Sequence, residues 1–204
     1  MSKQLNSNAF TLIELLSVMV IILVLAGITV PVVSSARTSA KKGVTSAQIG
    51  QLELALKQFE SDFGVYPPDS YTVAADTAIS VGGISIPLDD DVGTGTKCLV
   101  FFLGSKFTFS SASFNNIYGP YIEFKKSQLD EVTGDFFTDN PPDITIEGVN
   151  GTMKVYQYKD PFGEYYIYNS SSPANNRSSF DIYSYGADTT DDSGSGSSDD
   201  ITNW

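Results

Sequence analysis

The stretch AFTLIELLSVMVIILVLAG, from Ala9 to Gly27, decides how this chain is organised. It leads into an uncharged run of 19 residues between Leu15 and Val33. A helix from Phe10 to Val33 would be about 36 Å long at 1.5 Å per residue, which exceeds the roughly 30 Å of a bilayer's hydrocarbon core. The segment is therefore predicted to be a membrane-spanning helix or a secretory signal.

A single acidic residue, Glu14, lies near the start of this apolar run. A carboxylate inside a spanning helix costs on the order of 2.5–3.5 kcal/mol on insertion scales, so it needs a partner or a function. An ordinary secretory signal would explain the basic Lys3, the apolar run and the small residues SSA at 34–36. The run is long for such a signal, however, and an ordinary signal has no acid at this position.

The segment resembles the class III signal of type IV pilins and type II secretion pseudopilins. In that family a prepilin peptidase cuts before a phenylalanine followed by Thr-Leu-Ile-Glu and methylates the new amino terminus. The resemblance implies cleavage between Ala9 and Phe10, loss of a leader of residues 1–9, and N-methylation of Phe10. Ala9 departs from the glycine that the family usually has before the cut. Pro31 falls where many members have a helix-kinking proline.

The resemblance also gives Glu14 a role in assembly. Cleavage creates a cationic amine on Phe10, and Glu14 of one subunit can neutralise the amine of its neighbour in a filament. The Coulomb attraction is about 4 kcal/mol at 4 Å and an effective dielectric constant near 20, before desolvation is subtracted. We therefore expect assembly, and not membrane insertion, to depend on Glu14.

The charges that flank the span give a conflicting indication of its orientation. The N-terminal flank holds only Lys3, whereas Arg37, Lys41 and Lys42 follow the span. The positive-inside rule taken alone would place the globular part in the cytoplasm. The cleavage motif implies the opposite, because the peptidase acts on a cytoplasmic leader. We therefore expect a single-pass inner-membrane protein with a periplasmic C-terminal domain.

The helical pattern continues beyond the predicted span of residues 10–33, over residues 34–64. Apolar residues recur there at intervals of three and four and form one stripe: Ile49, Leu52, Leu56, Phe59 and Phe63. Gly64 is a candidate left-handed cap, and Pro67 and Pro68 prevent the helix from continuing. One long helix is predicted, whose second half packs its stripe on a sheet.

Residues 65–204 are predicted to form the globular domain. Two runs, Met153–Lys159 and Glu164–Asn169, flank the turn DPFG, and Ser179–Gly186 is a third run. An antiparallel meander of these three strands on the helix stripe is the simplest arrangement. The run KCLVFFLGSKF is either a buried helix or a strand, because periodicity cannot decide between them. The turn resembles Asp-Pro-Trp-Gly of major pseudopilins, with Phe162 in place of the tryptophan.

The composition of the chain excludes several classes of function. The formal net charge is −12, and no basic patch for phosphate binding is visible, so nucleic acid is not an expected partner. The chain has no histidine, and Cys98 is its only cysteine. A Cys–His nucleophile, a zinc cluster and an intramolecular disulfide are therefore ruled out. We expect the protein not to be an enzyme.

The C-terminal segment 185–204, YGADTTDDSGSGSSDDITNW, is acidic and has no cation. Its Ser, Gly and Asp content favours a disordered tail, whereas Ile201 and Trp204 favour an anchored one. Carboxylates around a flexible loop suit calcium, which takes six to eight oxygen ligands, but the EF-hand pattern is absent.

The tail resembles the end of major pseudopilins, in which a loop closes around one calcium ion. The resemblance implies side-chain oxygens from Asp188, Asp199 and Asp200 and backbone carbonyls from Tyr185 and Thr190. Asp191 and Asp192 have no clear counterpart in the family, and they are either outer ligands or merely solvated. The calcium would hold the C-terminal segment beside the sheet.

These observations predict an α+β, pilin-like fold: a long N-terminal helix on a small antiparallel sheet, with a C-terminal metal loop. The resemblance implies a structural subunit of the type II secretion pseudopilus, a filament that drives folded proteins across the outer membrane. Expected partners are further copies of the chain, minor pseudopilins, the prepilin peptidase, the inner-membrane assembly platform and inner-membrane lipid. Two alternatives remain: a type IV pilin of a surface pilus or DNA-uptake system, and an exported calcium-binding or enzymatic domain behind an ordinary signal peptide.

Overall fold

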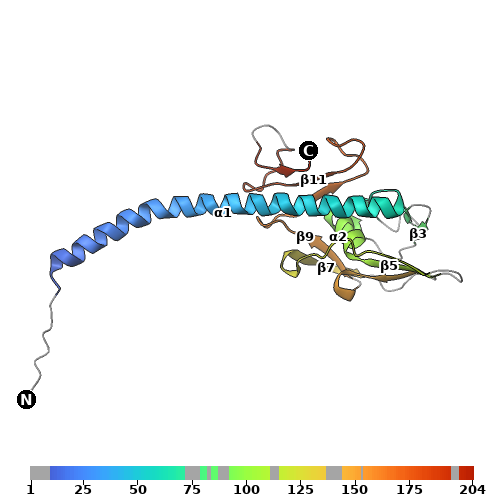
Figure 1. Ribbon diagram of the computed structural model, residues 1–204, viewed down its shortest axis with the longest axis horizontal. Coiled ribbons are helices and arrows are strands. Elements are labelled where there is room, and N and C mark those ends of the chain that lie inside the picture. The colour runs from blue at the N-terminus through green and yellow to red at the C-terminus, as the bar shows by residue number, and fades with distance from the viewer. Residues whose placement is uncertain are drawn as a thin grey trace, which may run out of the picture. The chain divides into compact units, whose positions relative to one another are not determined.

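The computed structural model describes residues 10–71, 79–81, 84–86, 92–110, 115–136, 144–152, 154–193 and 198–204. The chain divides into two compact units, Met1–Ala40 and Lys41–Trp204, and the boundary falls inside the long helix α1 (Leu12–Phe63) (Figure 1). Helix α1 continues through position 31 without a break, so the proline there does not end it.

The first unit presents an apolar helix surface. Every large apolar side chain described between Phe10 and Val33 is exposed. By length and composition, α1 is the one helix among the described residues that could cross a membrane: its most apolar window has a mean hydropathy of 2.8 and none of it is buried. A single chain rarely exposes so much apolar surface to water, so this part of α1 is built to contact lipid or other protein.

In the second unit, α1 supplies one wall of the hydrophobic core. The predicted stripe is confirmed, because all five of its residues are buried: Ile49, Leu52, Leu56, Phe59 and Phe63. The helix ends as predicted at Gly64, whose φ of 75° is left-handed and whose N–H donates to the Glu60 carbonyl at 2.7 Å.

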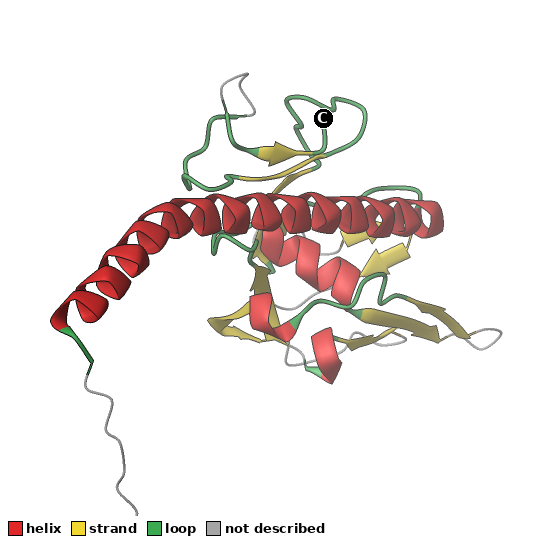
Figure 2. Cartoon of the chain, turned by 60° about the vertical axis from the view of Figure 1, so that its left-hand side comes forward, coloured by secondary structure: helices red, strands yellow, loops and turns green. Residues whose placement is uncertain are grey.

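The other elements are short. Their bounds are β1 (Ser70–Tyr71), β2 (Ile79–Val81), β3 (Ile84–Ile86), β4 (Gly93–Thr94), α2 (Thr96–Gly104), β5 (Lys106–Ser110), β6 (Asn115–Tyr118), η1 (Lys126–Gln128), β7 (Leu129–Phe136), β8 (Ile144–Glu147), η2 (Val149–Gly151), β9 (Lys154–Tyr158), β10 (Ile167–Asn169), β11 (Asp181–Ser184) and β12 (Ile201–Thr202). Two views of the second unit place the C-terminal loops on one side of α1 and place α2, β5 and β7 on the other (Figures 1 and 2).

The strands form several small antiparallel sheets. Two sheets have three strands, in the orders β10-β11-β12 and β6-β5-β8, and the pairs β7-β9, β2-β3 and β1-β4 complete the described set. This arrangement confirms the α+β, pilin-like class: a long helix that packs on small antiparallel sheets.

The predicted three-strand meander is confirmed in part: β10 pairs with β11, whereas the main partner of β9 is β7, which lies outside the three predicted runs. The runs on either side of DPFG meet as a short hairpin: Lys159 and Tyr165 form a bridge, and the Tyr166 N–H donates to the Tyr158 carbonyl at 3.2 Å. In the DPFG turn that joins them, the Asp160 carboxylate accepts three successive N–H groups, from Phe162, Gly163 and Glu164, at 2.8, 2.8 and 3.1 Å. The carboxylate therefore stabilises the turn of this short hairpin.

Helix α2 resolves the ambiguous run KCLVFFLGSKF. The run begins in a helix and, after Ser105, continues as strand β5. Helix α2 is buried almost all round, which is why its sequence carries no one-sided periodicity. The Phe102 ring contacts Phe59 of α1 at 6.0 Å and Phe107 of β5 at 6.3 Å between ring centroids, so α2 links the long helix to the β6-β5-β8 sheet.

Candidate functional site

The first turn of α1 is closed by a capping box formed by Thr11 and Glu14. The Thr11 backbone N–H and hydroxyl both donate to Glu14 Oε2 at 2.8 Å, and the Glu14 N–H donates back to the Thr11 hydroxyl at 3.3 Å. A Thr-x-x-Glu pair is a known signature of a helix start, because each side chain satisfies a backbone N–H that has no partner inside the helix. The sequence TLIE contains this helix-start signature, but the predicted role of Glu14 considered only its charge in assembly.

The capping box does not neutralise Glu14. The carboxylate is exposed, and none of the cations in the described part of the chain forms an ion pair with it. Phe10 lies directly before the box and is 82% exposed. Ala9, the other residue of the predicted cleavage site, lies outside the described residues. The structure therefore places Phe10 and Glu14 next to each other at the start of an exposed apolar helix.

The C-terminal segment is anchored to the sheet. β12 pairs with β11 in the register Tyr183 to Thr202 and Ser184 to Ile201. The Asn203 side chain accepts the Ile182 N–H at 3.0 Å and donates to the Phe180 carbonyl at 3.1 Å. The anchor that Ile201 and Trp204 suggested is thus present among the described residues of the tail.

The acidic loop between β11 and β12 is held at its entry by the DPFG turn. Asp160 is buried, and its second carboxylate oxygen accepts a hydrogen bond from the Ser184 hydroxyl. The Ser184 oxygen in turn accepts the Gly186 N–H at 3.1 Å. A chain of contacts therefore connects the turn Asp160–Gly163 to the first residues of the loop.

The two ends of the acidic loop cross at Gly186. Its φ is 75°, and a Cβ atom at this position would overlap the backbone carbonyl of Asp199. Only glycine fits such a close approach in a left-handed conformation. Gly186 therefore brings Asp199 beside the residues that immediately follow β11.

Local turns then fold the acidic side chains toward one another. Asp188 accepts the Thr190 N–H at 2.9 Å, and Asp191 accepts the Ser193 N–H at 2.9 Å. Thr189 and Ser193 have positive φ values of 59° and 53°, which are uncommon for residues with a Cβ. The outcome is a group of three carboxylates, each offering an oxygen within 4.8 Å of the others: Asp188, Asp192 and Asp199.

The structure brings together two of the three predicted side-chain ligands, Asp188 and Asp199. The third carboxylate of the group is Asp192, and Asp200 is not part of it. Tyr185 directly follows β11, and Thr190 is held in the Asp188 turn, so both residues lie in the loop as expected. Asp192 could not be singled out from the sequence, because its carboxylate reaches those of Asp188 and Asp199 only through the left-handed backbone of Thr189 and Ser193.

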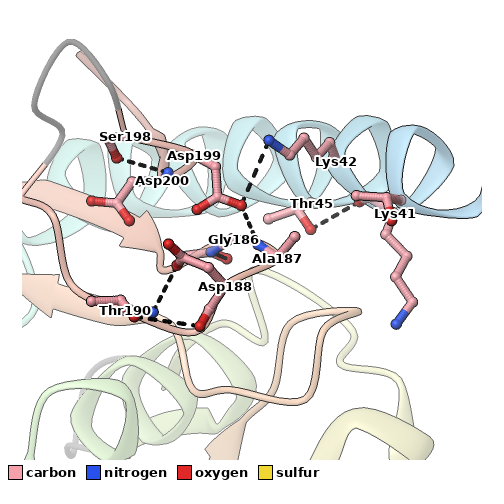
Figure 3. A network of polar contacts seen from close by, with 12 residues as sticks. Lys41, Lys42, Thr45, Gly186, Ala187, Asp188, Thr190, Ser198, Asp199 and Asp200 are labelled. Atoms are coloured by element: carbon pink, nitrogen blue, oxygen red, sulfur yellow. Dashed lines mark hydrogen bonds and ion pairs between the residues drawn. The ribbon is translucent and has the colours of Figure 1, made fainter. Parts of the chain in front are cut away.

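Asp199 uses its two carboxylate oxygens differently (Figure 3). Oδ2 accepts the Ala187 N–H at 2.6 Å and lies 3.7 Å from the Lys42 ammonium of α1. Oδ1 is buried and accepts no hydrogen bond from the described residues. A buried carboxylate oxygen without a donor, beside two further carboxylates, is a donor set that fits a hard divalent cation.

The electrostatics of the group reflect its concentration of negative charge. Desolvation raises the pKa of Asp192, and the charges of Asp188, Asp200, Asp199 and Asp191 raise it further. Desolvation also raises the pKa of Asp199. Hydrogen bonds with the Ala187 N–H and with Asp188, together with the Lys42 charge, outweigh this effect. The pKa of Asp199 therefore lies below its ordinary value. Bringing the carboxylates together therefore works against the ionisation of Asp192.

Two protein-family models match the chain, one at each end. Residues 5–30 match the prokaryotic N-terminal methylation motif. Residues 138–204, which include the DPFG turn and the acidic loop, match the type II secretion system (T2SS), protein G. Together, the two matches support a type IV pilin-like protein related to the major pseudopilins of type II secretion. No curated protein and no solved structure matches it.

The matches cover both candidate regions of this pilin-like protein. The methylation motif includes Phe10, Thr11 and Glu14, and the protein G match includes the three grouped carboxylates. The motif and the apolar helix fit a single-pass membrane-anchored protein, and the protein G match fits a subunit that assembles with other secretion components. Residues 31–137, including α2 and the β6–β5 hairpin, lie outside both matches.

Proposed function

We propose that this protein is a structural subunit of a type II secretion pseudopilus. The first part of α1 anchors it in the inner membrane and later packs in the filament, while the C-terminal domain lies in the periplasm. The filament, built with minor pseudopilins on an inner-membrane assembly platform, drives folded proteins toward the outer membrane. The role is mechanical and not catalytic. The observation that carries the proposal is Glu14, which has no cationic partner among the described residues, at the start of the exposed apolar part of α1.

We propose that a prepilin peptidase prepares the subunit for assembly by cutting between Ala9 and Phe10 and methylating Phe10. The cut leaves an amine next to the capping box, one residue before Thr11. Two unpaired charges, the amine and Glu14, are costly in a lipid or filament core, and each is the natural partner of the other in a neighbouring subunit. Mass spectrometry of the mature protein tests the cut directly: the expected N-terminal residue is N-methylated Phe10.

The charge of Glu14 can be separated from its role in the cap. Glu14→Gln keeps a side chain that can accept the Thr11 N–H but removes the charge, whereas Thr11→Val keeps the charge and weakens the cap. We expect Glu14→Gln to abolish filament formation while the protein still inserts in the membrane. We expect Thr11→Val to retain filaments, because losing a cap costs only about 1 kcal/mol. Electron microscopy of sheared filaments and membrane fractionation measure the two steps.

Filaments of normal length and number from the Glu14→Gln variant would refute the proposed charge pairing. Loss of filaments in Thr11→Val with normal filaments in Glu14→Gln would assign the motif to the helix cap alone. A mature protein that begins at Arg37 or nearby would point to an ordinary secretory signal and would overturn the pseudopilin function as a whole.

We propose that the acidic loop binds calcium, with Asp188, Asp192 and Asp199 as the side-chain ligands. Bound calcium would supply positive charge that neutralises the three carboxylates and would close the loop against β11. A ligand at a concentration of 100 Kd stabilises a protein by about 2.7 kcal/mol, which raises the melting temperature by several degrees for a chain of this size. The full-length protein in detergent should therefore melt several degrees higher in millimolar calcium than in chelator.

Two substitutions in the loop give a matched comparison for calcium. Asp188→Asn removes a grouped carboxylate, and we expect it to remove most of the calcium-dependent shift in melting temperature. Asp191→Asn removes the same charge from a carboxylate outside the group, and we expect most of the shift to remain. Equal melting temperatures in calcium and chelator for the unmodified protein would eliminate calcium from the proposal.

A type IV pilin of a surface pilus shares the N-terminal motif but is the weaker candidate. The match of residues 138–204 to protein G of type II secretion favours the pseudopilus. The genes beside this one give a simple test, because a secretin and secreted proteins indicate secretion, whereas a retraction ATPase indicates a pilus.

A further inference from the structure

An ion pair links the acidic loop to helix α1. The Lys42 ammonium lies 3.7 Å from Asp199 Oδ2, with the two side chains 41% and 25% exposed. At this separation the pair is held by charge and not by a hydrogen bond. Lys41, the preceding residue, faces elsewhere: its ammonium lies 5.3 Å from the centre of the Phe162 ring. Of two adjacent lysines on α1, one contacts the carboxylates and the other contacts an aromatic ring.

Asp199 does not need Lys42 to keep its position. Its Oδ2 already accepts the Ala187 N–H at 2.6 Å, and its backbone is fixed where the loop ends cross at Gly186. The lysine therefore contributes charge to the group and does little to orient it. Its exposure means that the ammonium can move into solvent when another cation arrives.

We propose that Lys42 is the built-in counter-cation of the acidic loop and sets its affinity for divalent cations. The inference rests on the proposed calcium site, and it adds that the Lys42 ammonium competes with calcium for the carboxylates of that site. Without metal, the ammonium offsets part of the repulsion among Asp188, Asp192 and Asp199. When a divalent cation binds these carboxylates, it repels the ammonium from Asp199, so the two cations compete for the same charge.

The competition couples the loop to α1. A cation that displaces Lys42 changes the charge presented by the helix, and by thermodynamic reciprocity any partner that draws Lys42 away from Asp199 strengthens cation binding. Such a partner is an anionic group, for example a carboxylate of a neighbouring copy or a lipid phosphate. The loop and the helix would then respond to each other without any change of fold.

Lys42→Gln tests the proposal, and Lys41→Gln is the matched control. Each variant removes one positive charge from adjacent positions of the same helix, so the change in net charge is identical. The full-length protein in detergent micelles is titrated with calcium chloride by calorimetry at low salt. A monovalent cation several ångströms from a divalent one lowers affinity by about threefold to tenfold at high dielectric, and the effect shrinks as salt screens it.

We expect Lys42→Gln to bind calcium about threefold to tenfold more tightly than the unmodified protein, and Lys41→Gln to bind as the unmodified protein does. In chelator, Lys42→Gln should also melt below Lys41→Gln, because the loop has lost its counter-charge. In saturating calcium the two variants should melt at the same temperature. Higher salt should reduce the difference in affinity between Lys42→Gln and the unmodified protein.

Other outcomes separate this inference from the calcium site itself. Calcium binding of equal strength in both variants, or weaker binding in Lys42→Gln, would overturn the role of Lys42 and leave the calcium site standing. Binding by Lys42→Gln alone would support the competition, but it would overturn the proposed calcium site of the unmodified protein, because Lys42 would then occupy the place of the metal. Absence of binding in all three proteins, with equal melting temperatures, would overturn both proposals.

Discussion

Gly186 is the residue on which the geometry of the acidic loop depends most directly. It combines a left-handed φ of 75° with a backbone neighbour, Asp199, that leaves no room for a Cβ. The two demands are separable, because Gly151 has the same φ of 75° but has no atom within 4 Å of a Cβ built there. Conformational strain alone therefore acts at Gly151, and strain plus overlap acts at Gly186.

We expect Gly151→Ala to destabilise the protein by about 1–2 kcal/mol, the usual cost of a left-handed conformation for a residue with a Cβ. Gly186→Ala should cost more, because the Asp199 backbone has to move as well, and it should also weaken calcium binding. Urea unfolding of both variants measures the first effect, and calorimetry measures the second. Equal losses of stability in the two variants would show that the loop ends separate easily.

Single residues also mark the limit of what the sequence predicts about the site. Asp188 and Asp199 could be assigned because they fall in a recognisable acidic tail. Asp192 enters the group only through the positive φ values of Thr189 and Ser193, which composition does not reveal. Lys42 is remote from Asp199 in the sequence, and no periodic pattern connects them.

At the scale of elements, local sequence specified helices better than strand partners. The stripe of α1 and its glycine cap were readable because a helix that is buried on one side has a period of 3.6 residues. Helix α2 lacked such a period because the core surrounds it. The strands around DPFG were recognisable individually, but alternation does not say which strand pairs with which, and β7, the main partner of β9, was not among the predicted strands.

A buried polar network fixes α1 against β9 and the residue directly before β10. Gln48 is 5% exposed; its amide donates to Tyr158 OH at 2.9 Å, and its Oε1 accepts from Tyr166 OH at 2.7 Å. The Gln48 amide also donates to Gln128 Oε1 at 2.8 Å. These contacts set the position of the helix on the sheet in a way that apolar packing, which is not directional, does not.

We expect Gln48→Met to destabilise the protein by about 1–3 kcal/mol, because it leaves the Tyr166 hydroxyl buried without its acceptor. Adding Tyr166→Phe should recover part of the loss, since the unsatisfied hydroxyl is then absent. Gln51→Met, on the exposed face of the same helix, is the control and should change stability by less than about 0.5 kcal/mol. Thermal unfolding of the two single variants and the double variant measures the coupling between Gln48 and Tyr166. Strictly additive losses of stability from Gln48→Met and Tyr166→Phe would contradict the network.

At the scale of the whole molecule, the two ends of the chain carry the family resemblance and the middle carries much of the core. Helix α2 and β5 lie outside both family matches, yet they supply buried aromatic residues that contact α1. The sequence predicted little about this region, because its elements are short and defined by tertiary contacts. The middle therefore serves as a scaffold on which the second half of α1 packs.

Burial of tyrosines in the second unit predicts how the stability of the protein depends on alkaline pH. Desolvation raises the pKa of Tyr158, Tyr166 and Tyr168 above the ordinary value of 10.0, and desolvation followed by the Asp191 charge raises that of Tyr183 to about 12. Above pH 10 the unfolded chain releases these protons while the folded protein retains them. Stability is therefore complete below about pH 10 and falls as the pH rises toward 12.

We expect the melting temperature to be constant between pH 8 and pH 9 and to fall steeply above about pH 10. Phenolate absorbance recorded in the same samples should rise together with unfolding, because the buried hydroxyls ionise only when the core opens. Tyr166→Phe, which removes one buried phenol, should have a shallower alkaline slope than the unmodified protein. Ionisation of Tyr166 at pH 10 in a fully folded sample, measured as the difference in phenolate absorbance from Tyr166→Phe, would mean that the buried tyrosines are accessible and that the core between α1 and the sheets is looser than the structure describes.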